Sequence, residues 1–531
     1  MRDLPEQPDL PGGGLCRRPG WLLAVAIALA LGMGLWGSAP VLAAPGDIVD
    51  CRPPFNLSNS PGYVSVDPFL LSDPTGVVHL FWAERTIGEP GDIPNVPDAL
   101  MYSRWDGERW SKPVDIFISP RQYFNRRIAG IRGVMDQQGF IHLVWMGPDN
   151  TFFYSAARAD RAGSAQGWLP PLLLGDDQSG TQFSVDIAYE PPRALHILYG
   201  RSQPQVNRTV TYIRSVDGGA TWSEPVDVYT FLDFERGASN VRLLTEPPGK
   251  VYATWTEWDS SGNGQAVYFA RSLDSGSTWE EPVRLAERVG DEYERDWTTL
   301  AVLEPGRLVA LWEGGFRAYP QTQYSDDGGA TWSAPIDTFF WLIADNGFGE
   351  FVRDSTGRLH VFLVRRIREG YSHLCGRFVG CRGDGNTIWH SVWEAGVNWR
   401  DPRPVGGFHD SNFISVAMNL GNQLFLSWFN YDNPETSLDI FTMQCTVEGA
   451  PALAPQPWPA VDMPTPTPVA TAWPTPTPLP EVTATPAPVV SVQATPVGRS
   501  NPATPLLVGA LPSLALLVLA VMVERIRRRG R

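Results

Sequence analysis

The chain has 531 residues, of which 43% are apolar and 21 are Trp, so it can bury a large core. A formal net charge of −15 excludes nucleic acid as a partner, because nucleic-acid-binding proteins present a basic surface. The five Cys form no C-x-x-C pair, so we expect neither a metal site nor another cofactor.

Residues 1–44 predict a secretory signal peptide. Two Arg precede an apolar run at 21–36, and Val41 and Ala43 occupy the −3 and −1 positions of a small-residue cleavage site. Cleavage is expected after Ala43 or Ala44. An uncleaved N-terminal anchor is the alternative, because the run is near the lower length limit for a membrane span. With either a cleaved signal peptide or an uncleaved anchor, the body of the protein is expected to be exported.

Residues 45–449 contain a weak repeat with a period in the fifties, in the range expected for β-propeller blades. Each unit has a turn followed by an apolar strand, usually with an aromatic residue six positions after the turn. Seven units follow this pattern, at Trp82, Trp145, Tyr199, Trp255, Trp312, Leu363 and Ser427 beside Trp428. We therefore favour seven blades, with six as the alternative because the second and seventh units are the weakest.

Four histidines occupy one position of this repeat. His79, His142, His196 and His360 each lie three residues after the turn position. Recurrence at one repeat position indicates a structural role, so we do not expect these side chains to be catalytic.

One short motif is written three times, at 215–225, 272–282 and 325–335. Its Gly residues supply the positive φ of a tight turn, and its Asp can accept backbone N–H groups. Thr and Trp are expected to start the outgoing strand, where the indole fills the gap between neighbouring sheets. The motif residues are Ser215, Asp217, Gly219, Thr221 and Trp222, then Ser272, Asp274, Gly276, Thr278 and Trp279, and finally Ser325, Asp327, Gly329, Thr331 and Trp332.

The spacing S-x-D-x-G-x-T-W resembles the Asp-box of the sialidase (neuraminidase) superfamily and of related BNR-repeat β-propellers. The resemblance implies an all-β propeller of Asp-box repeats, with the boxes on the rim and away from the sugar site. Enzymes of that family have six blades, so the seven units found in this sequence are a departure from the pattern.

The resemblance also implies a catalytic set, which this sequence matches poorly. Sialidases grip the ligand carboxylate with three Arg, because a guanidinium fork bonds a carboxylate through two parallel hydrogen bonds. Arg127 matches the first Arg, although the Pro of the family's R-I-P motif is missing. Glu313 stands where the second Arg belongs, with Arg317 nearby. Tyr293 and Glu294 are the candidates for the nucleophilic Tyr–Glu pair, and we find no Asp acid/base.

The loops around a propeller channel are expected to form the binding face. They carry aromatic side chains together with carboxylates and guanidinium groups, a combination used in sugar recognition and also found on protein-binding rims. The predicted ligand-binding residues are Arg127, Arg236, Asp296, Trp297 and Trp341.

The ends of the repeat region predict how the ring closes. Residues 51–58 look like an outer strand that no strand precedes, and the seventh unit lacks an outer strand. The N-terminal strand is therefore expected to complete the last blade beside 440–447, which removes two exposed sheet edges. Disulfides are expected for Cys51–Cys445 and Cys375–Cys381, because an exported domain is in an oxidising compartment.

The C-terminal part predicts a tethered protein. Residues 450–504 are rich in Pro and Thr and are expected to form an extended stalk. An apolar run at 505–523 has the length of a transmembrane helix, and the five Arg among residues 524–531 predict a cytoplasmic tail. The propeller would then be extracellular on a single-pass membrane protein.

Three functions remain open on the sequence. The first is a cell-surface propeller that recognises a carbohydrate or glycoprotein without a complete catalytic set. The alternative is an active exo-α-sialidase that cleaves terminal sialic acid, and the third is a protein-interaction propeller.

Overall fold

The computed structural model describes residues 43–458 except for short stretches inside that range. Those stretches are 87–97, 120–127, 149–150, 177–183, 204–205, 234, 290–295, 314–318, 344–348, 372, 375–385, 397, 406–411 and 434–436. The predicted membrane helix and tail, the stalk beyond Trp458, most of the signal peptide and the Cys375–Cys381 pair lie outside the described residues. Among the residues that are described, no helix is long and apolar enough to cross a membrane.

The described chain is built from sheets whose strands pair antiparallel, except for one parallel pairing between β3 (Tyr63–Ser72) and β31 (Ser437–Val447). Four sheets contain four strands each, taken consecutively from the sequence. They are β7 (Ala129–Met135) to β10 (Leu172–Asp176) through β8 (Phe140–Met146) and β9 (Thr151–Arg158); β11 (Val185–Glu190) to β14 (Val226–Thr230) through β12 (Ala194–Gln203) and β13 (Val206–Ser215); β15 (Gly237–Glu246) to β18 (Val283–Glu287) through β16 (Lys250–Trp258) and β17 (Gly264–Ser272); and β19 (Asp296–Glu304) to β22 (Ile336–Asp337) through β20 (Arg307–Glu313) and β21 (Pro320–Ser325).

Two larger sheets complete the set. One has six strands, β23 (Leu342–Ile343), β24 (Gly349–Arg353), β25 (Leu359–Ile367), β26 (Thr387–Glu394), β27 (Asn398–Trp399) and β28 (Arg403–Pro404). The other has nine, β1 (Ile48–Val49), β2 (Phe55–Asn56), β3 (Tyr63–Ser72), β4 (Val78–Thr86), β5 (Ala99–Trp105), β6 (Val114–Ile118), β29 (Asn412–Asn419), β30 (Gln423–Asn433) and β31 (Ser437–Val447).

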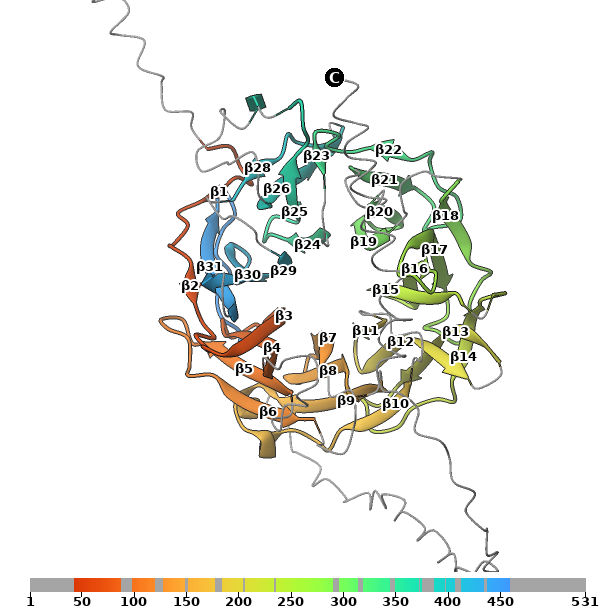
Figure 1. Cartoon of the computed structure of the whole chain (residues 1–531), viewed down its shortest axis with the longest axis horizontal. Helices are drawn as coiled ribbons and strands as arrows, with labels where there is room; N and C mark the ends of the chain where they lie inside the picture. The colour runs from red at the N-terminus through yellow and green to blue at the C-terminus, as the bar shows by residue number, and fades with distance from the viewer. Residues whose placement is uncertain are drawn as a thin grey trace, which may run out of the picture. The chain divides into compact units, whose positions relative to one another are not determined.

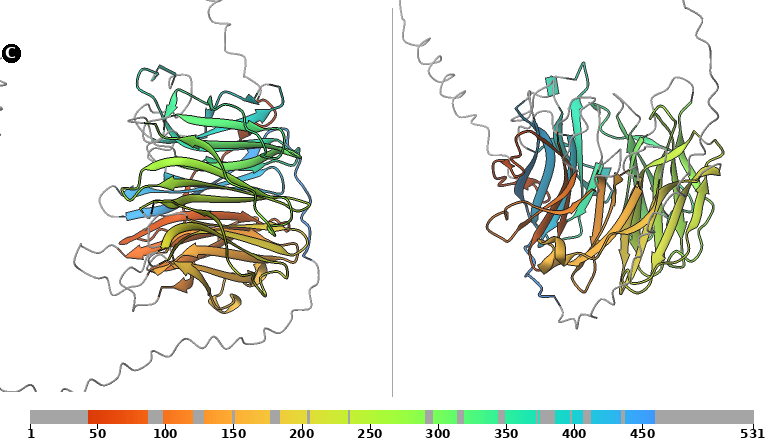
Figure 2. Two further views of the ribbon diagram at one scale, coloured as in Figure 1. Left: turned by 90° about the vertical axis from the view of Figure 1, so that its right-hand side faces the viewer. Right: turned by 60° about the horizontal axis from the view of Figure 1, so that its bottom comes forward.

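The sheets are arranged around a centre. Figure 1 shows β3, β7, β11, β15, β19, β24 and β29 nearest that centre, with the later strands of each sheet further out. Figure 2 shows that the strands of successive sheets lie face to face. This all-β arrangement of four-stranded sheets is consistent with the predicted β-propeller.

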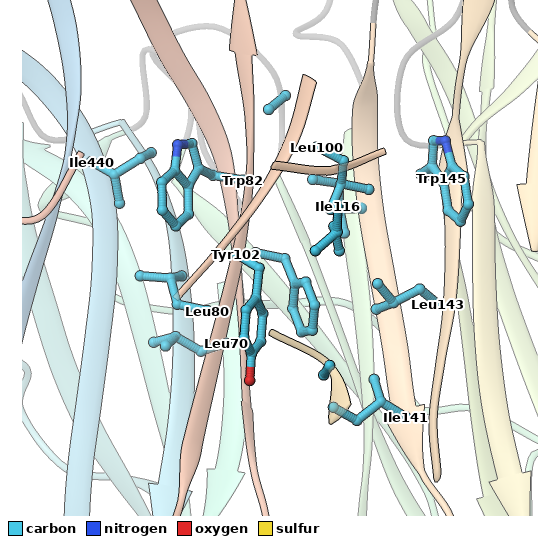
Figure 3. Close-up of a cluster of buried hydrophobic side chains, with 14 of the residues drawn as sticks. Leu70, Leu80, Trp82, Leu100, Tyr102, Ile116, Ile141, Leu143, Trp145 and Ile440 are labelled. Carbon is cyan, nitrogen blue, oxygen red and sulfur yellow. The ribbon is translucent and has the colours of Figure 1, made fainter. Parts of the chain in front are cut away.

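Apolar side chains fill the space between neighbouring sheets. In the largest cluster, Trp82 and Tyr102 on β4 and β5 are fully buried together with Trp145 on β8 and Ile440 on β31. Figure 3 shows these side chains between the strands. The aromatic residue that recurs in the sequence repeat is therefore core, which explains why its spacing is so regular.

The two ends of the described chain meet in the nine-stranded sheet. Ile48 and Val49 pair with Val447 and Thr446, and β2 pairs with β31 further along. A disulfide joins Cys51 to Cys445 between these two pairings. The predicted pairing of the N-terminal strand beside 440–447 and the predicted Cys51–Cys445 bridge are both confirmed.

The three repeated motifs form identical turns. In the first, Asp217 Oδ1 accepts the Thr221 amide at 2.9 Å, Asp217 Oδ2 accepts the Thr221 hydroxyl at 2.6 Å, and Ser215 Oγ accepts the Gly219 amide at 2.8 Å. The copies at Asp274 and Asp327 repeat these bonds. The predicted role of the Asp as an acceptor of backbone N–H groups is confirmed.

The start of the outgoing strand was predicted wrongly. The strands after the three motifs begin at Val226, Val283 and Ile336, four residues beyond the Trp in each case. The physical reason is that the Asp carboxylate holds the Thr inside the turn. Each indole still packs against the preceding sheet, because Trp222 contacts Tyr154 with a ring-centroid distance of 4.9 Å.

The recurring histidines are structural, as predicted. His79 and His142 are buried, and their Nδ1 atoms lie 2.8 Å from the hydroxyl groups of Tyr102 and Tyr154 on the next strand. On the other side of His79, Nε2 lies 3.4 Å from Asp73 in the turn after β3. The Asp73 carboxylate, the His79 imidazole and the Tyr102 hydroxyl thus link the turn after β3 to strands β4 and β5 of the same sheet.

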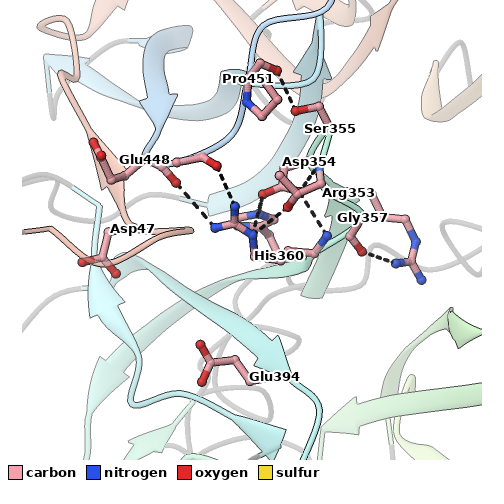
Figure 4. Close-up of polar contacts among 12 residues, drawn as sticks. Asp47, Arg353, Asp354, Ser355, Gly357, His360, Glu394, Glu448 and Pro451 are labelled. Atoms are coloured by element: carbon pink, nitrogen blue, oxygen red, sulfur yellow. Dashed lines mark hydrogen bonds and ion pairs between the residues drawn. The ribbon is translucent and has the colours of Figure 1, made fainter.

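The last described residues, 449–458, form a C-terminal strap over the turns that end the inner strands. Ser355 Oγ donates to the Pro451 carbonyl at 2.6 Å, and the Leu453 amide donates to the Leu420 carbonyl at 2.8 Å. Figure 4 shows the first of these contacts beside Asp354 and His360. The strap ends on Trp458, whose indole lies so close to Gly139 that a Cβ there would come within 2.7 Å of it.

Candidate functional site

Five innermost strands share one irregularity near their first residues. The register with the second strand shifts there in β3, β7, β15, β19 and β29. The residues with positive φ at these bulges are Asp67 (54°), Gly130 (60°), Asn240 (50°), Trp297 (50°) and Phe413 (42°). Bulges re-aim side chains and are frequent beside functional sites, and positive φ is costly for any residue except Gly. The geometry therefore marks this end of the inner strands as the candidate site.

An aromatic group with a fixed carboxylate lies at this end. We call Trp258, Trp297 and Phe413, with Asp296 and Asn240, the aromatic mouth. Asp296 Oδ1 accepts the Asn240 side-chain amide at 2.9 Å, the Trp258 indole N–H at 2.7 Å and the Trp297 backbone amide at 2.7 Å. Three donors on one oxygen fix the carboxylate of a side chain that is itself buried.

The Trp297 ring contacts the other two aromatic rings of the mouth edge to face. Trp297 meets Trp258 edge to face with a centroid distance of 6.1 Å and Phe413 with a centroid distance of 5.7 Å. All three side chains are half-buried. The contact between Trp297 on β19 and Phe413 on β29 joins two sheets, so the mouth is an inter-sheet feature.

A buried ion pair lies directly behind the mouth. Glu313 is opposite Asp296 in the strand register, and it pairs with Arg365 of β25. Both side chains are at most 1% exposed. Burial raises the pKa of Glu313 to about 8, and Asp296 adds to this rise while Arg365 opposes it. Sequence reasoning noticed Glu313 and missed Arg365, although a charged residue at the end of an apolar strand was a usable signal.

Four more charged residues lie at one level of the inner strands. We call Arg132, Asp186, Arg242 and Glu350 the channel cluster. They pair in register with Val144, Leu198, Thr254 and Phe362, which occupy one and the same position of the repeat.

The channel cluster balances its own charge. Arg242 Nη2 lies 3.5 Å from Glu350 Oε1, and Asp186 Oδ2 accepts the Leu243 amide at 2.8 Å. Burial lowers the pKa of Arg132 to about 10, an effect increased by Arg242 and opposed by Glu350 and Asp186. Arg242 follows Asn240 by two residues on β15, on the far side of the register shift that begins at Ser239. None of these four residues was predicted.

The structure brings together two of the predicted ligand-binding residues, Asp296 and Trp297. Arg236 precedes β15 and faces Asp233 at 3.7 Å and Glu257 at 3.8 Å. Trp341 packs on Trp389 of β26 with a centroid distance of 5.2 Å, in a different sheet. The other predicted site residues lie outside the described residues, namely Arg127, Tyr293, Glu294 and Arg317.

A cavity of about 450 Å³ lies at the opposite end of the inner strands, under the C-terminal strap. Its polar groups already have partners in the protein, since Arg353 donates to the Gly357 carbonyl at 2.6 Å and Asp354 faces His360 at 3.4 Å. Within the described part of the chain, no group of three or more His, Cys, Asp or Glu side chains could hold a metal ion. The aromatic mouth is therefore the stronger candidate.

No protein-family model matches the chain, and a search of curated proteins gives no match. Solved structures of similar shape include a polysaccharide lyase of family PL25, an ulvan lyase, at 10% identity over 75% of this chain and 94% of that chain, with a TM-score of 0.48. The BP39L lectin from Burkholderia pseudomallei is 12% identical over 76% and 99%, with a TM-score of 0.46. The NanB sialidase from Streptococcus pneumoniae is 12% identical over 77% and 72%, with a TM-score of 0.42. Such values do not assign an activity to this chain.

Proposed function

We propose that this protein is a carbohydrate-binding β-propeller whose ligand occupies the aromatic mouth. The observation that carries the proposal is the Asp296 carboxylate, held by three donors beside the half-buried rings of Trp297, Trp258 and Phe413. Sugars present apolar C–H faces and a rim of hydroxyls. Binding sites are typically apolar and aromatic with a few fixed polar groups, which suits both parts of a sugar.

We infer binding without hydrolysis. A sialidase would use guanidinium groups to grip the ligand carboxylate, yet two guanidinium groups near the mouth face carboxylates of the protein itself. Arg365 pairs with Glu313, and Arg242 lies against Glu350. A ligand carboxylate would have to displace these partners, and breaking a buried pair is costly.

A hydrolase remains the second candidate because of one observation. Burial raises the pKa of Glu313 to about 8, and Glu313 lies opposite Asp296 in the strand register, so a carboxyl group that can hold a proton near neutral pH has a second carboxyl group beside it. Such pairs serve as acid and base in glycoside hydrolysis. Release of sugar from a glycoconjugate by the full-length protein, abolished by Glu313→Gln, would favour this candidate.

We further propose that the head has seven blades and is displayed outside the cell on its Pro/Thr-rich stalk. Support for seven comes from the nine-stranded sheet, whose two groups β29–β31 and β3–β6 share one parallel residue pair, Val64 with Leu438. If these two groups are counted as separate blades, they and the other five sheets give seven blades. Protease added to intact cells should release the head, and protection of the head would contradict the topology.

The binding proposal predicts a loss of affinity on removal of one ring. Trp297→Ala in the detergent-solubilised full-length protein should weaken binding to its best ligand on a glycan array at least about tenfold, which corresponds to about 1.4 kcal/mol. Phe340→Ala is the matched control, because Phe340 is an exposed ring (49%) beside the separate β23 strand. Equal losses in both variants, or no glycan bound by the wild type, would contradict the proposal.

A further inference from the structure

The first described residues of the chain, 43–47, lie at the predicted cleavage site. Ala43 is exposed, whereas Gly46 three residues later is buried. The Gly46 amide donates to the Glu448 carbonyl at 2.7 Å, and the Glu448 amide donates to the Asp47 carbonyl at 2.9 Å. Residues 46–47 are thus already bonded to the end of β31.

The Asp47 carboxylate collects positive and polar donors at this point. Its Oδ2 accepts a hydrogen bond from the Ala44 backbone N–H at 2.9 Å and lies 3.0 Å from Arg403 Nη1. Its Oδ1 lies 3.5 Å from Arg400 Nη1. The Asp47 side chain is only 13% exposed, and Figure 4 shows it beside Glu448. Two guanidinium groups, one from Arg403 on β28 and one from Arg400 just after β27, therefore converge on the carboxylate that also accepts the Ala44 N–H.

We propose that the export signal is removed by cleavage between Ala43 and Ala44, and that Asp47 is the receptor for the new N-terminus. A signal-processing peptidase supplies the catalysis and water is the co-reactant. The hydroxyl of water goes to the Ala43 carbonyl carbon, and its proton goes to the nitrogen of Ala44. The nitrogen 2.9 Å from Asp47 then changes from an amide into an amine, which is protonated below a pKa of about 8.

The neighbouring bond fits less well. Cleavage after Ala44 would sever a bond to Pro45, whose preceding residue is sterically restricted, and would remove the nitrogen that Asp47 holds. The bond between Ala43 and Ala44 has an exposed residue on its leaving side and a small residue at the −3 position, Val41. The geometry therefore distinguishes between two cleavage sites that the sequence pattern leaves equivalent.

Cleavage should tighten the junction between the chain ends. An amide offers one N–H to Asp47, whereas an ammonium offers three and adds a charge. The other charged groups at this junction are Arg400, which also pairs with Glu394, Arg403, and Arg358, which bonds the Gly449 carbonyl. A partner carboxylate raises the pKa of the amine in the folded state. The added stability is therefore present below about pH 8 and is lost as the pH rises through the raised value.

The first test is the intact mass of the exported full-length protein. The expected N-terminal residue is Ala44. A chain that begins at Met1 or at Pro45 would overturn the proposal. This readout is independent of ligand binding, so it can fail while the proposed function stands.

The second test moves the ammonium group without moving the cleavage site. One Ser inserted between Ala43 and Ala44, with the new terminus confirmed by mass, displaces the ammonium by about 3.6 Å. At pH 6.5 the insertion should lower the melting temperature of the full-length protein by about 1–3 °C, as expected for one partly exposed ion pair. The difference should vanish at pH 10 and in the Asp47→Asn background. If the insertion lowers the melting temperature of the Asp47→Asn protein as much as that of the wild type, the proposed role of Asp47 is overturned.

Discussion

At the scale of single residues, the candidate site depends on side chains whose partners are far away in the sequence. Trp297 was predicted because aromatic and acidic residues cluster around it. Arg365 and the channel cluster were not predicted, because their partners lie on other sheets, such as Glu350 for Arg242. A charge on an apolar strand can be recognised in a sequence, but the group that neutralises it depends on which inner strands converge.

Glu313 provides a pH-dependent test of the buried pair. Its pKa is raised by burial from an ordinary carboxyl value to about 8, so the folded protein binds a proton more readily than the unfolded chain does. Wild-type stability relative to Glu313→Gln should therefore fall as the pH rises from about 5 to 9. Thermal melting of both proteins across this range measures the effect.

Removal of the carboxyl group gives the matching control. Glu313→Ala leaves the buried Arg365 guanidinium without its side-chain hydrogen-bond partner, which should lower the free energy of unfolding by about 1–3 kcal/mol at neutral pH. Glu313→Gln keeps a hydrogen-bond acceptor and should cost less. A Glu313→Ala variant that melts like the wild type would contradict the buried pair.

At the scale of elements, the motif turns were predictable because their interactions are local. Ser215, Asp217, Gly219 and Thr221 lie within seven consecutive residues, and their bonds follow from the spacing alone. The strand start after Trp222 was predicted wrongly, since propensity favoured a strand where the Asp carboxylate holds a turn. Local hydrogen bonds outweigh strand propensity at this point.

The turns predict a stabilising effect that is separate from ligand binding. Asp217→Ala should lower the free energy of unfolding by about 1–2 kcal/mol, because it removes the acceptor for the Thr221 amide and hydroxyl. Ligand affinity should stay near that of the wild type, since the turn lies at the end of the sheets opposite the mouth. Urea unfolding and a glycan-binding assay measure the two quantities. A loss of affinity with unchanged stability would place the turn in the site.

The three motif carboxylates also predict how the head responds to acid. Partial burial would raise the pKa of Asp217, but bonds from Thr221 and Ser215 outweigh it and lower the pKa. Bonds from Thr331 and Ser325 lower the pKa of Asp327 to about 2. A depressed pKa stabilises the fold above the ordinary Asp value, and this contribution is lost as the pH falls towards 2.

At the scale of the whole molecule, the junction of the chain ends could be predicted because three independent signals agreed. The seventh unit lacks an outer strand, residues 51–58 supply one, and each segment carries a Cys. The pairing of β2 with β31 and the Cys51–Cys445 bridge confirm that reasoning. The aromatic mouth was only partly predictable, because its bulges appear in the register of paired strands and leave no regular sequence signature.

The disulfide predicts a large difference between two Cys variants. The bridge joins residues 394 apart, so the chain-entropy model gives it about 4–5 kcal/mol. Cys51→Ser should therefore melt the head well below the wild type under non-reducing conditions. Cys381→Ser, which affects the predicted short-loop pair, should change the melting temperature much less. Equal melting of Cys51→Ser and wild type would show that strand pairing alone holds the junction.

The C-terminal strap determines how a mechanical load would enter the head. A pull on the chain beyond Trp458 reaches the turns that the strap is bonded to, at Ser355, Leu420 and Pro74, and not the strand ends that hold Asp296. The backbone amide of Gln456 donates to the Pro74 carbonyl at 2.7 Å. This bond is nearer to the C-terminal end of the strap than the bonds at Leu453 and Pro451, so a pull would reach it first. A pull on the C-terminal end of the strap would therefore peel it from the turns at that end of the inner strands before it reached the aromatic mouth, which lies at the other end of the same strands.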